Sequence, residues 1–228
     1  MTLPLAFIWV LIISAFSVLG AYYARKFGRP DALVVFYVTT VIFSNIAASK
    51  VILFDLVYGE LYASVTVLTF SVTFLLTDIV NERFGKRETQ RMILLAVFCQ
   101  AVFVLYSYLA LRALPAPFFA NQQAFEIVMG GVPRLMLASF VAFFVSENFD
   151  AYLFQWFKNL TRGRHLWMRN AFSSLPAMLA DGILFNVIAF YGVFPLIPLT
   201  IGLTLIKWAV GVINIPFMYL SRAVLEKG

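Results

Sequence analysis

Charged residues, cysteine and histidine are all scarce in this sequence of 228 residues. Only 12% of the residues are charged and 62% are hydrophobic, against ~25% and ~45–50% in an average soluble domain. A water-facing globule of this size cannot hide so much apolar side chain, which excludes a soluble enzyme and indicates a membrane protein. With one cysteine, Cys99, and one histidine, His165, no disulfide framework and no His/Cys metal site is possible, and we expect no cofactor.

The apolar residues form seven runs, each long enough to cross a hydrocarbon core of about 30 Å as a helix. The runs are Leu3–Ala24, Ala32–Leu53, Leu61–Val80, Arg91–Arg112, Pro133–Phe157, Ala171–Phe194 and Leu196–Arg222. Basic residues follow the first run and none precedes it, so we interpret it as a retained helix and not as a signal peptide. The sequence therefore predicts an all-α fold: a single transmembrane domain over residues 1–228, a polytopic bundle of about seven helices.

Basic residues are distributed unevenly between the loops that join these runs. Loops one, three and five and the C-terminal tail hold 13 of the 17 Lys and Arg residues, whereas the even-numbered loops hold only Arg112 and Arg134. The positive-inside rule therefore predicts a multi-pass protein of the cytoplasmic (inner) membrane with its N-terminus outside and its C-terminus in the cytoplasm. This bias also explains the net charge of +6. The lipid bilayer is the expected partner, nucleic acid is not, and the oligomeric state stays open.

Two residues of opposite charge interrupt the last two runs at the same depth. With a rise of ~1.5 Å per residue, Asp181 lies about 15 Å into the sixth run and Lys207 about 16 Å into the seventh, near the midplane in both cases. Ionisable groups at that depth cost several kcal/mol unless they are paired or hydrated. The two residues form either a structural ion pair or a substrate or proton site whose charges are exchanged during transport, and both interpretations stay open.

The seventh run also carries a polar stripe. Thr200, Thr204, Lys207, Gly211 and Asn214 recur every three or four residues and share one helix face, a pattern that fits a cavity lining but also plain interhelical hydrogen bonding. Further polar candidates on the other runs are Asn45, Lys50, Asp78, Asp150 and Asn186. With Phe, Tyr and Trp nearby, such groups suit a flat, hydrogen-bonding heterocycle, although composition alone does not name the solute.

Four separate strings of the sequence carry a family resemblance. They are NIAASKVILF (Asn45–Phe54), FLLTDIVNERFGK (Phe74–Lys86), SENFDAYLFQWFKN (Ser146–Asn159) and LWMRNAFSSLPAMLADGILFNVIAFYG (Leu166–Gly192). Together they resemble the queuosine precursor transporter family, also called the putative vitamin uptake transporter family. The resemblance implies a transporter, not an enzyme, that imports 7-deazaguanine bases. It also implies a helical fold similar to the substrate-binding components of energy-coupling vitamin transporters.

The resemblance implies a set of site residues as well. The polar positions of the family motifs fall on Asn45, Lys50, Asp78, Glu82, Asp150, Arg169, Ser174 and Asp181. Together with the polar residues above, the predicted substrate-binding residues are Asp181, Asn45, Lys50, Asp78, Asp150, Ser174, Asn186 and Lys207, with no catalytic residue and no metal ligand. Of these, we expect Asp181 to accept the N–H groups of the planar deazapurine.

Two other functions stay open at this point. One is a substrate-binding membrane module of a multi-component vitamin or nucleobase transporter, which needs a separate energising complex. The other is a membrane-embedded metal-dependent enzyme that uses Asp78, Glu82, Glu147 and Asp150 as carboxylate ligands. The lack of a dense aspartate motif, a Ser/His or Cys/His arrangement and a Gly-rich phosphate loop argues against the enzyme.

Overall fold

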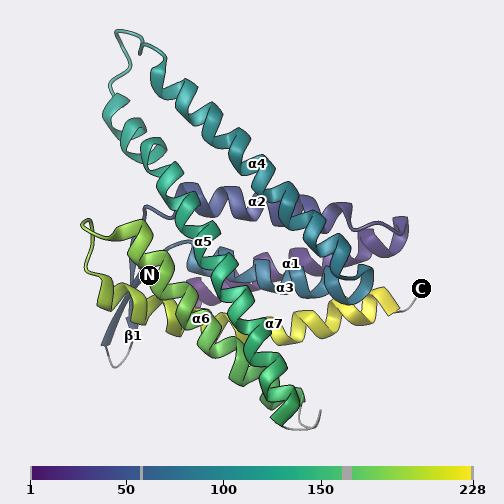
Figure 1. The fold of residues 1–228 in the computed structure, drawn as a ribbon. Helices are drawn as coiled ribbons and strands as arrows, with labels where there is room; N and C mark the ends of the chain where they lie inside the picture. The colour runs from purple at the N-terminus through teal and green to yellow at the C-terminus, as the bar shows by residue number, and fades with distance from the viewer. Residues whose placement is uncertain (1, 57–58, 161–165, 227–228) are drawn as a thin grey trace.

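Seven helices and one β-hairpin form the described part of the chain in the computed structural model (Figure 1). The helices are α1 (Leu3–Phe27), α2 (Asp31–Ala47), α3 (Val67–Phe84), α4 (Lys86–Arg112), α5 (Gln122–Leu160), α6 (Leu166–Phe190) and α7 (Leu196–Glu226), and the strands are β1 (Val51–Leu56) and β2 (Gly59–Ser64). The structure describes residues 2–56, 59–160 and 166–226, and the side chains at 3, 56, 147, 150, 151, 154, 155, 157–159, 166–174 and 226 lie outside this description. The predicted all-α helix bundle is confirmed.

Four of these helices are long and apolar enough to cross a membrane. They are α1, α4, the first part of α5 and α7. In addition, α2 and the second part of α6, Leu175–Phe190, are shorter apolar helices. Large side chains on the long helices are exposed, among them Leu19, Leu94 and Val212. A surface this apolar is suited to lipid, as expected of a multi-pass membrane protein.

The central helix of the bundle is α3, which contacts α1, α2, α4 and α7. Ten of its 18 residues are buried, and three of them are the polar residues Thr69, Ser71 and Thr73. A helix that is covered on nearly every side lies in the core rather than at the lipid boundary. The Thr73 hydroxyl donates to the Phe70 carbonyl oxygen at 2.6 Å, so this buried hydroxyl is satisfied within the helix.

A β-hairpin lies where the sequence predicted helix. The predicted spans Ala32–Leu53 and Leu61–Val80 run into the two strands, whereas α2 ends at Ala47 and α3 begins at Val67. The predicted boundaries are wrong here because hydropathy reports apolar content and not backbone conformation. The β-branched residues Val51 and Ile52 favour an extended chain over a further helical turn.

The hairpin packs one face against the bundle. In its antiparallel register Ile52 pairs with Ala63 and Phe54 with Leu61, and these four side chains pack in a core cluster with residues of α1, α3 and α7. Gly202 of α7 permits this approach, because a Cβ atom at this position would lie 2.0 Å from the carbonyl oxygen of Tyr62. The backbone of β2 therefore lies directly on α7, which holds the hairpin over one end of the helix bundle.

On the outer face of the hairpin, Tyr62 lies beside Glu60. The Tyr62 hydroxyl donates a hydrogen bond to the Glu60 carboxylate. This hydrogen bond and the negative charge of Glu60 raise the pKa of Tyr62 above its usual value of 10.0. Asp55 is also exposed, so acidic groups face away from the core here.

The helices α4 and α5 continue beyond the predicted spans and project as an arm past the other helices (Figure 1). The helix α5 begins at Gln122, inside the fourth predicted loop between Arg112 and Pro133, and passes through Pro133 without ending. The neighbouring α6 is attached to α5 by Arg134. Its guanidinium donates to the carbonyl oxygens of Ile188 and Tyr191, both at 2.8 Å, and so satisfies carbonyl groups that the end of a helix leaves without partners.

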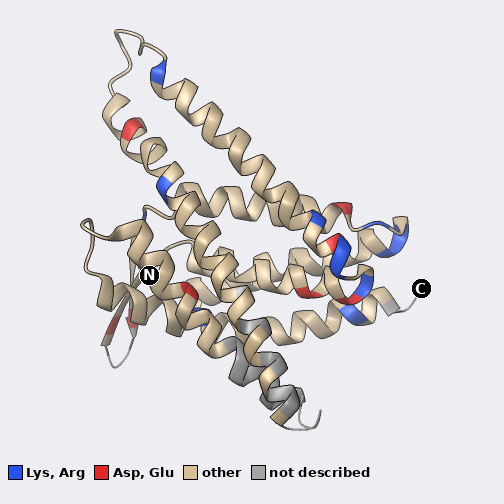
Figure 2. Cartoon of the chain, in the orientation of Figure 1, with Lys and Arg blue, Asp and Glu red and all other residues tan. Residues whose placement is uncertain are grey.

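Most of the Lys and Arg residues whose side chains the structure describes gather at the end of the bundle that carries the C-terminus (Figure 2). They come from the ends of α1 and α3, the start of α4 and the end of α7: Arg25, Lys26, Arg29, Arg83, Lys86, Arg87, Arg91 and Arg222. An ion pair of 3.2 Å between Arg222 and Glu82 joins α7 to α3 at this end. The described basic residues of predicted loops one and three and of the C-terminal tail thus lie on the same side of the bundle. The structure does not describe the side chains of the basic residues in predicted loop five: Lys158, Arg162, Arg164 and Arg169.

Candidate functional site

Asp181 of α6 and Lys207 of α7 meet in the interior of the bundle. Their side chains form an ion pair in which each is only 4% exposed, and the hydroxyl of Ser146 lies 3.5 Å from the Asp181 carboxylate. Gly182 favours this close approach, since a Cβ atom there would lie 3.1 Å from the Thr204 hydroxyl oxygen. The structure therefore brings together the two charges that the sequence placed at one depth, and neither of them faces lipid.

A small cavity lies beside this ion pair. Its lining comes from five helices and their ends: Ser44, Asn45 and Ala48 at the end of α2, Thr66, Val67 and Phe70 around the start of α3, Ser139 of α5, Asp181 and Phe185 of α6, and Leu203 and Lys207 of α7. The hairpin joins α2 to α3 beside the cavity. There the Ser64 hydroxyl donates to the Ala48 carbonyl oxygen at 3.0 Å and lies 2.9 Å from the hydroxyl of Thr66.

The cavity is small in this conformation. Its volume is about 30 Å³, which is room for one or two water molecules, whereas pockets that hold organic ligands have volumes of ~300–1,000 Å³. A planar base therefore fits only after the lining side chains or helices move apart. Because Lys207 already contacts the Asp181 carboxylate, the ion pair is the contact that such a movement has to open or share.

Two of the neutral polar groups in the lining differ in their hydrogen bonding: Asn45 has a partner and Ser44 has none among the described residues. Asn45 donates from its side-chain nitrogen to the Gln100 oxygen at 2.8 Å, which orients the amide and leaves its own oxygen as an acceptor. The hydroxyl of Ser44 is 3% exposed at the residue level and has no hydrogen-bond partner within the described part of the chain. Buried polar groups normally have a partner, so the unpaired Ser44 hydroxyl is a candidate for a contact with water or with a ligand in the cavity.

The other predicted site residues lie in several places. Asn186 is buried on α6 and donates to the Thr200 hydroxyl at 3.1 Å, so it pairs with α7 and does not line the cavity. Lys50 is exposed in the turn between α2 and β1, and Asp78 is exposed near the end of α3. The side chains of Asp150 and Ser174 lie outside the described part of the chain. Of the six predicted residues whose side chains the structure describes, it thus brings Asp181, Asn45 and Lys207 to the cavity.

The polar stripe on α7 faces inward, as its spacing predicted. Thr204, Lys207 and Asn214 are all buried, and Asn214 lies deeper along the helix toward the basic end. Its side-chain oxygen accepts from the Ser14 hydroxyl at 2.8 Å, and its nitrogen donates to the Ser71 carbonyl oxygen at 3.4 Å. The part of the stripe around Asn214 therefore joins α7 to α1 and α3, while the part around Lys207 lines the cavity.

Sequence reasoning missed Ser44, Ser139 and the two aromatic residues Phe70 and Phe185 as parts of one site. Ser44 lies one helical turn before Ala48, which also lines the cavity, so a small-residue face on α2 was a usable signal. Ser139 carried no signal, because a lone serine in an apolar helix is common. The two Phe residues are recognisable only once the fold brings α3 and α6 together.

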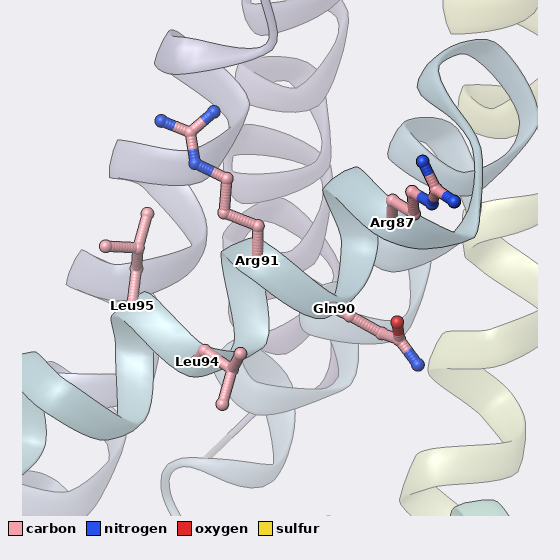
Figure 3. A pocket seen from close by; sticks show the side chains of 5 residues that line it. All are labelled: Arg87, Gln90, Arg91, Leu94 and Leu95. Carbon is pink, nitrogen blue, oxygen red and sulfur yellow. The ribbon is translucent and has the colours of Figure 1, made fainter.

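A second hollow lies on the surface at the start of α4 and is lined by Arg87, Gln90, Arg91, Leu94 and Leu95 (Figure 3). Arg87, Arg91 and Leu95 project to one side of the helix, whereas Gln90 and Leu94 project to the other, so the side chains do not converge (Figure 3). Arg91 is also paired with Glu88 at 3.3 Å. We therefore regard the cavity around Asp181 as the candidate substrate site. Among the described residues no group of three or more His, Cys, Asp or Glu side chains is placed to hold a metal ion.

Comparison with known proteins supports a transport function. The family model described as "putative vitamin uptake transporter" matches residues 64–221. The chain is 26% identical over 223 residues to a protein of Bacillus subtilis (strain 168) named "probable queuosine precursor transporter", and the match covers 95% of this chain and 94% of that protein. No solved structure matches the chain. The family match includes four of the five helices that line the cavity, α3 and α5 to α7.

Proposed function

Because the chain belongs to the putative vitamin uptake transporter family, we propose that it imports a queuosine precursor, a 7-deazaguanine base, across the cytoplasmic membrane. The substrate class comes from the name of the Bacillus subtilis relative. The family is one of transporters, which favours transport over catalysis. The basic end of the bundle, by the positive-inside rule, then faces the cytoplasm, so that the N-terminus lies outside.

The observation that carries this proposal is the buried Asp181 carboxylate, which is paired with Lys207 in a cavity whose other described lining residues are uncharged and include two phenylalanines. A deazaguanine offers a ring N–H and an exocyclic amine on one edge, and a single carboxylate accepts both. Phe70 and Phe185 line the same cavity and supply apolar faces for the planar ring. The oxygen of Asn45 and the hydroxyl of Ser44 are further polar groups at its edge.

Transport by this site requires that the cavity widens. The base competes with Lys207 for the Asp181 carboxylate, and binding moves the Lys207 ammonium to another acceptor or to the carbonyl group of the base. Asn214 forms a hydrogen-bonded cluster with Ser14 and Ser71, called the Asn214 cluster here. The hairpin and the Asn214 cluster lie on opposite sides of the ion pair along the bundle. We propose that substrate passes the hairpin from outside and is released past the Asn214 cluster toward the basic end.

The test is uptake of a radiolabelled 7-deazaguanine base by cells that cannot synthesise it, with and without this chain. We expect accumulation that depends on the chain and is blocked by excess unlabelled base. An absence of uptake in well-expressing cells contradicts the proposal. Reconstitution of the purified chain in liposomes separates the two forms of transporter: uptake shows that the chain acts alone, whereas binding without uptake shows that it is a module that needs an energising complex.

A further inference from the structure

The charges of the residues that line the cavity restrict the charge of the substrate that can bind there. Among the described residues that line the cavity, Asp181 and Lys207 are the charged ones, and they have opposite signs and are in contact. The other polar lining residues, Ser44, Asn45, Thr66 and Ser139, are neutral. The described part of the wall therefore holds one buried anion that is already compensated by one buried cation, and its net charge is zero.

A neutral base and a cationic base change the number of buried charges in this cavity differently. A neutral base inserts between Asp181 and Lys207 or beside them and leaves the count of buried charges unchanged. A base with a protonated amine adds a second cation, while the described wall offers a single carboxylate. One of the two ammonium groups then stays buried without a counter-ion, which is strongly unfavourable in a site of low dielectric constant.

Lys207 cannot avoid this conflict by leaving the site. Its residue is 3% exposed, and its attachment point lies between Thr204 and Gly211 in the middle of α7, where both neighbouring turns face the interior. A long lysine side chain reaches water only when it lies near the end of a membrane helix. The positive charge of Lys207 is therefore a fixed part of the chamber that receives the substrate.

From this charge count we propose that Lys207 is a specificity-determining residue that selects bases with an uncharged 7-substituent over bases with a 7-ammonium group. The proposal rests on the proposed function and refines its substrate class. Asp181 contributes the acceptor for the heterocycle edge common to both kinds of base, and Lys207 repels the cationic substituent. A neutral 7-cyano group or 7-hydroxymethyl group meets no such repulsion.

The experiment compares two nearly isosteric competitors for uptake of labelled 7-cyano-7-deazaguanine at neutral pH. They are the 7-hydroxymethyl base, which is neutral, and the 7-aminomethyl base, which carries an ammonium group. We expect the hydroxymethyl base to inhibit at a concentration at least tenfold lower than the aminomethyl base. Equal inhibition by the two, or stronger inhibition by the aminomethyl base, overturns the proposal. If no 7-deazaguanine is taken up or competes, the proposed function itself has failed.

A second test of the proposal uses the variant Lys207→Met. In Lys207→Met the carboxylate of Asp181 loses its cation, so we expect the aminomethyl base to become the better ligand and to raise the thermal stability of the purified variant more than the hydroxymethyl base does. Lys207→Arg keeps the charge and should keep the wild-type order. An unchanged preference in Lys207→Met contradicts the proposal. If this variant does not fold without ligand, its recovery when purified with each base gives the same comparison.

Discussion

We expect Asp181→Asn and the double variant Asp181→Asn/Lys207→Met both to lose uptake of the labelled base, and only the double variant to retain the folded yield of the wild type. In Asp181→Asn the Lys207 ammonium stays buried without its counter-ion, which costs ~3–5 kcal/mol. The double variant removes both buried charges and replaces the lysine by an apolar side chain of similar length. It therefore folds, yet it has no carboxylate to accept the N–H groups of a base.

The measurements are uptake in cells and the amount of monodisperse protein after size-exclusion chromatography in detergent. A matched control is Asp55→Asn, which makes the same chemical change on the exposed face of the hairpin and should leave uptake at the wild-type rate. Transport at the wild-type rate by the double variant would show that the ion pair only packs α6 against α7. That outcome would remove Asp181 from the substrate site.

A methyl group at position 202 is expected to displace the hairpin. In Gly202→Ala the new Cβ atom lies 2.0 Å from the carbonyl oxygen and 2.8 Å from the carbonyl carbon of Tyr62. Both atoms belong to the backbone, so no side-chain rotation relieves the clash and β2 has to move off α7. We expect a loss of stability of at least about 2 kcal/mol and a fall in uptake, because the hairpin connects the two helix ends that carry Ser44 and Thr66.

Thermal unfolding of the purified protein and uptake in cells measure this effect. Gly130→Ala is the control: it adds the same methyl group to α5, where no atom lies within 4 Å of the new Cβ. We expect this variant to be as stable as the wild type or more so, since alanine favours the helix. Wild-type stability and uptake in Gly202→Ala would show that the hairpin does not rest on α7 as described.

Hydropathy and helical spacing were sufficient to predict the elements that depend on local sequence. Each long apolar run contains a helix, and the equal depths of Asp181 and Lys207 were predictable because depth along a membrane helix follows from residue count. Their contact also requires that α6 and α7 turn these two faces toward each other. The inward face of Thr204, Lys207 and Asn214 followed from their spacing in the same way. These features can be predicted from the sequence of one helix at a time, or from the depths of residues in two helices that cross the same membrane.

The features that depend on contacts between distant segments were not predicted. The hairpin is apolar, so hydropathy assigned its strands to neighbouring helices, and its position depends on Gly202 about 140 residues later in the sequence. Asn45 reaches the cavity, whereas Lys50, five residues on, lies in the exposed turn after α2, which the sequence assigned to helix. Ser44 and Ser139 join the site through tertiary packing, for which a single serine gives no sequence signal.

The most direct measurement of the central claim uses a cysteine at Ser44. Cys99 is the natural cysteine of the chain, so Cys99→Ser with Ser44→Cys gives one thiol in the cavity wall, and Cys99→Ser with Asn121→Cys gives a control in the exposed turn before α5. The rate of alkylation by a maleimide is measured with and without saturating 7-cyano-7-deazaguanine. We expect the base to slow modification at position 44 at least tenfold and to leave position 121 unchanged. An unchanged rate at position 44, in protein that still takes up the base, would contradict a substrate chamber around Asp181 and Lys207.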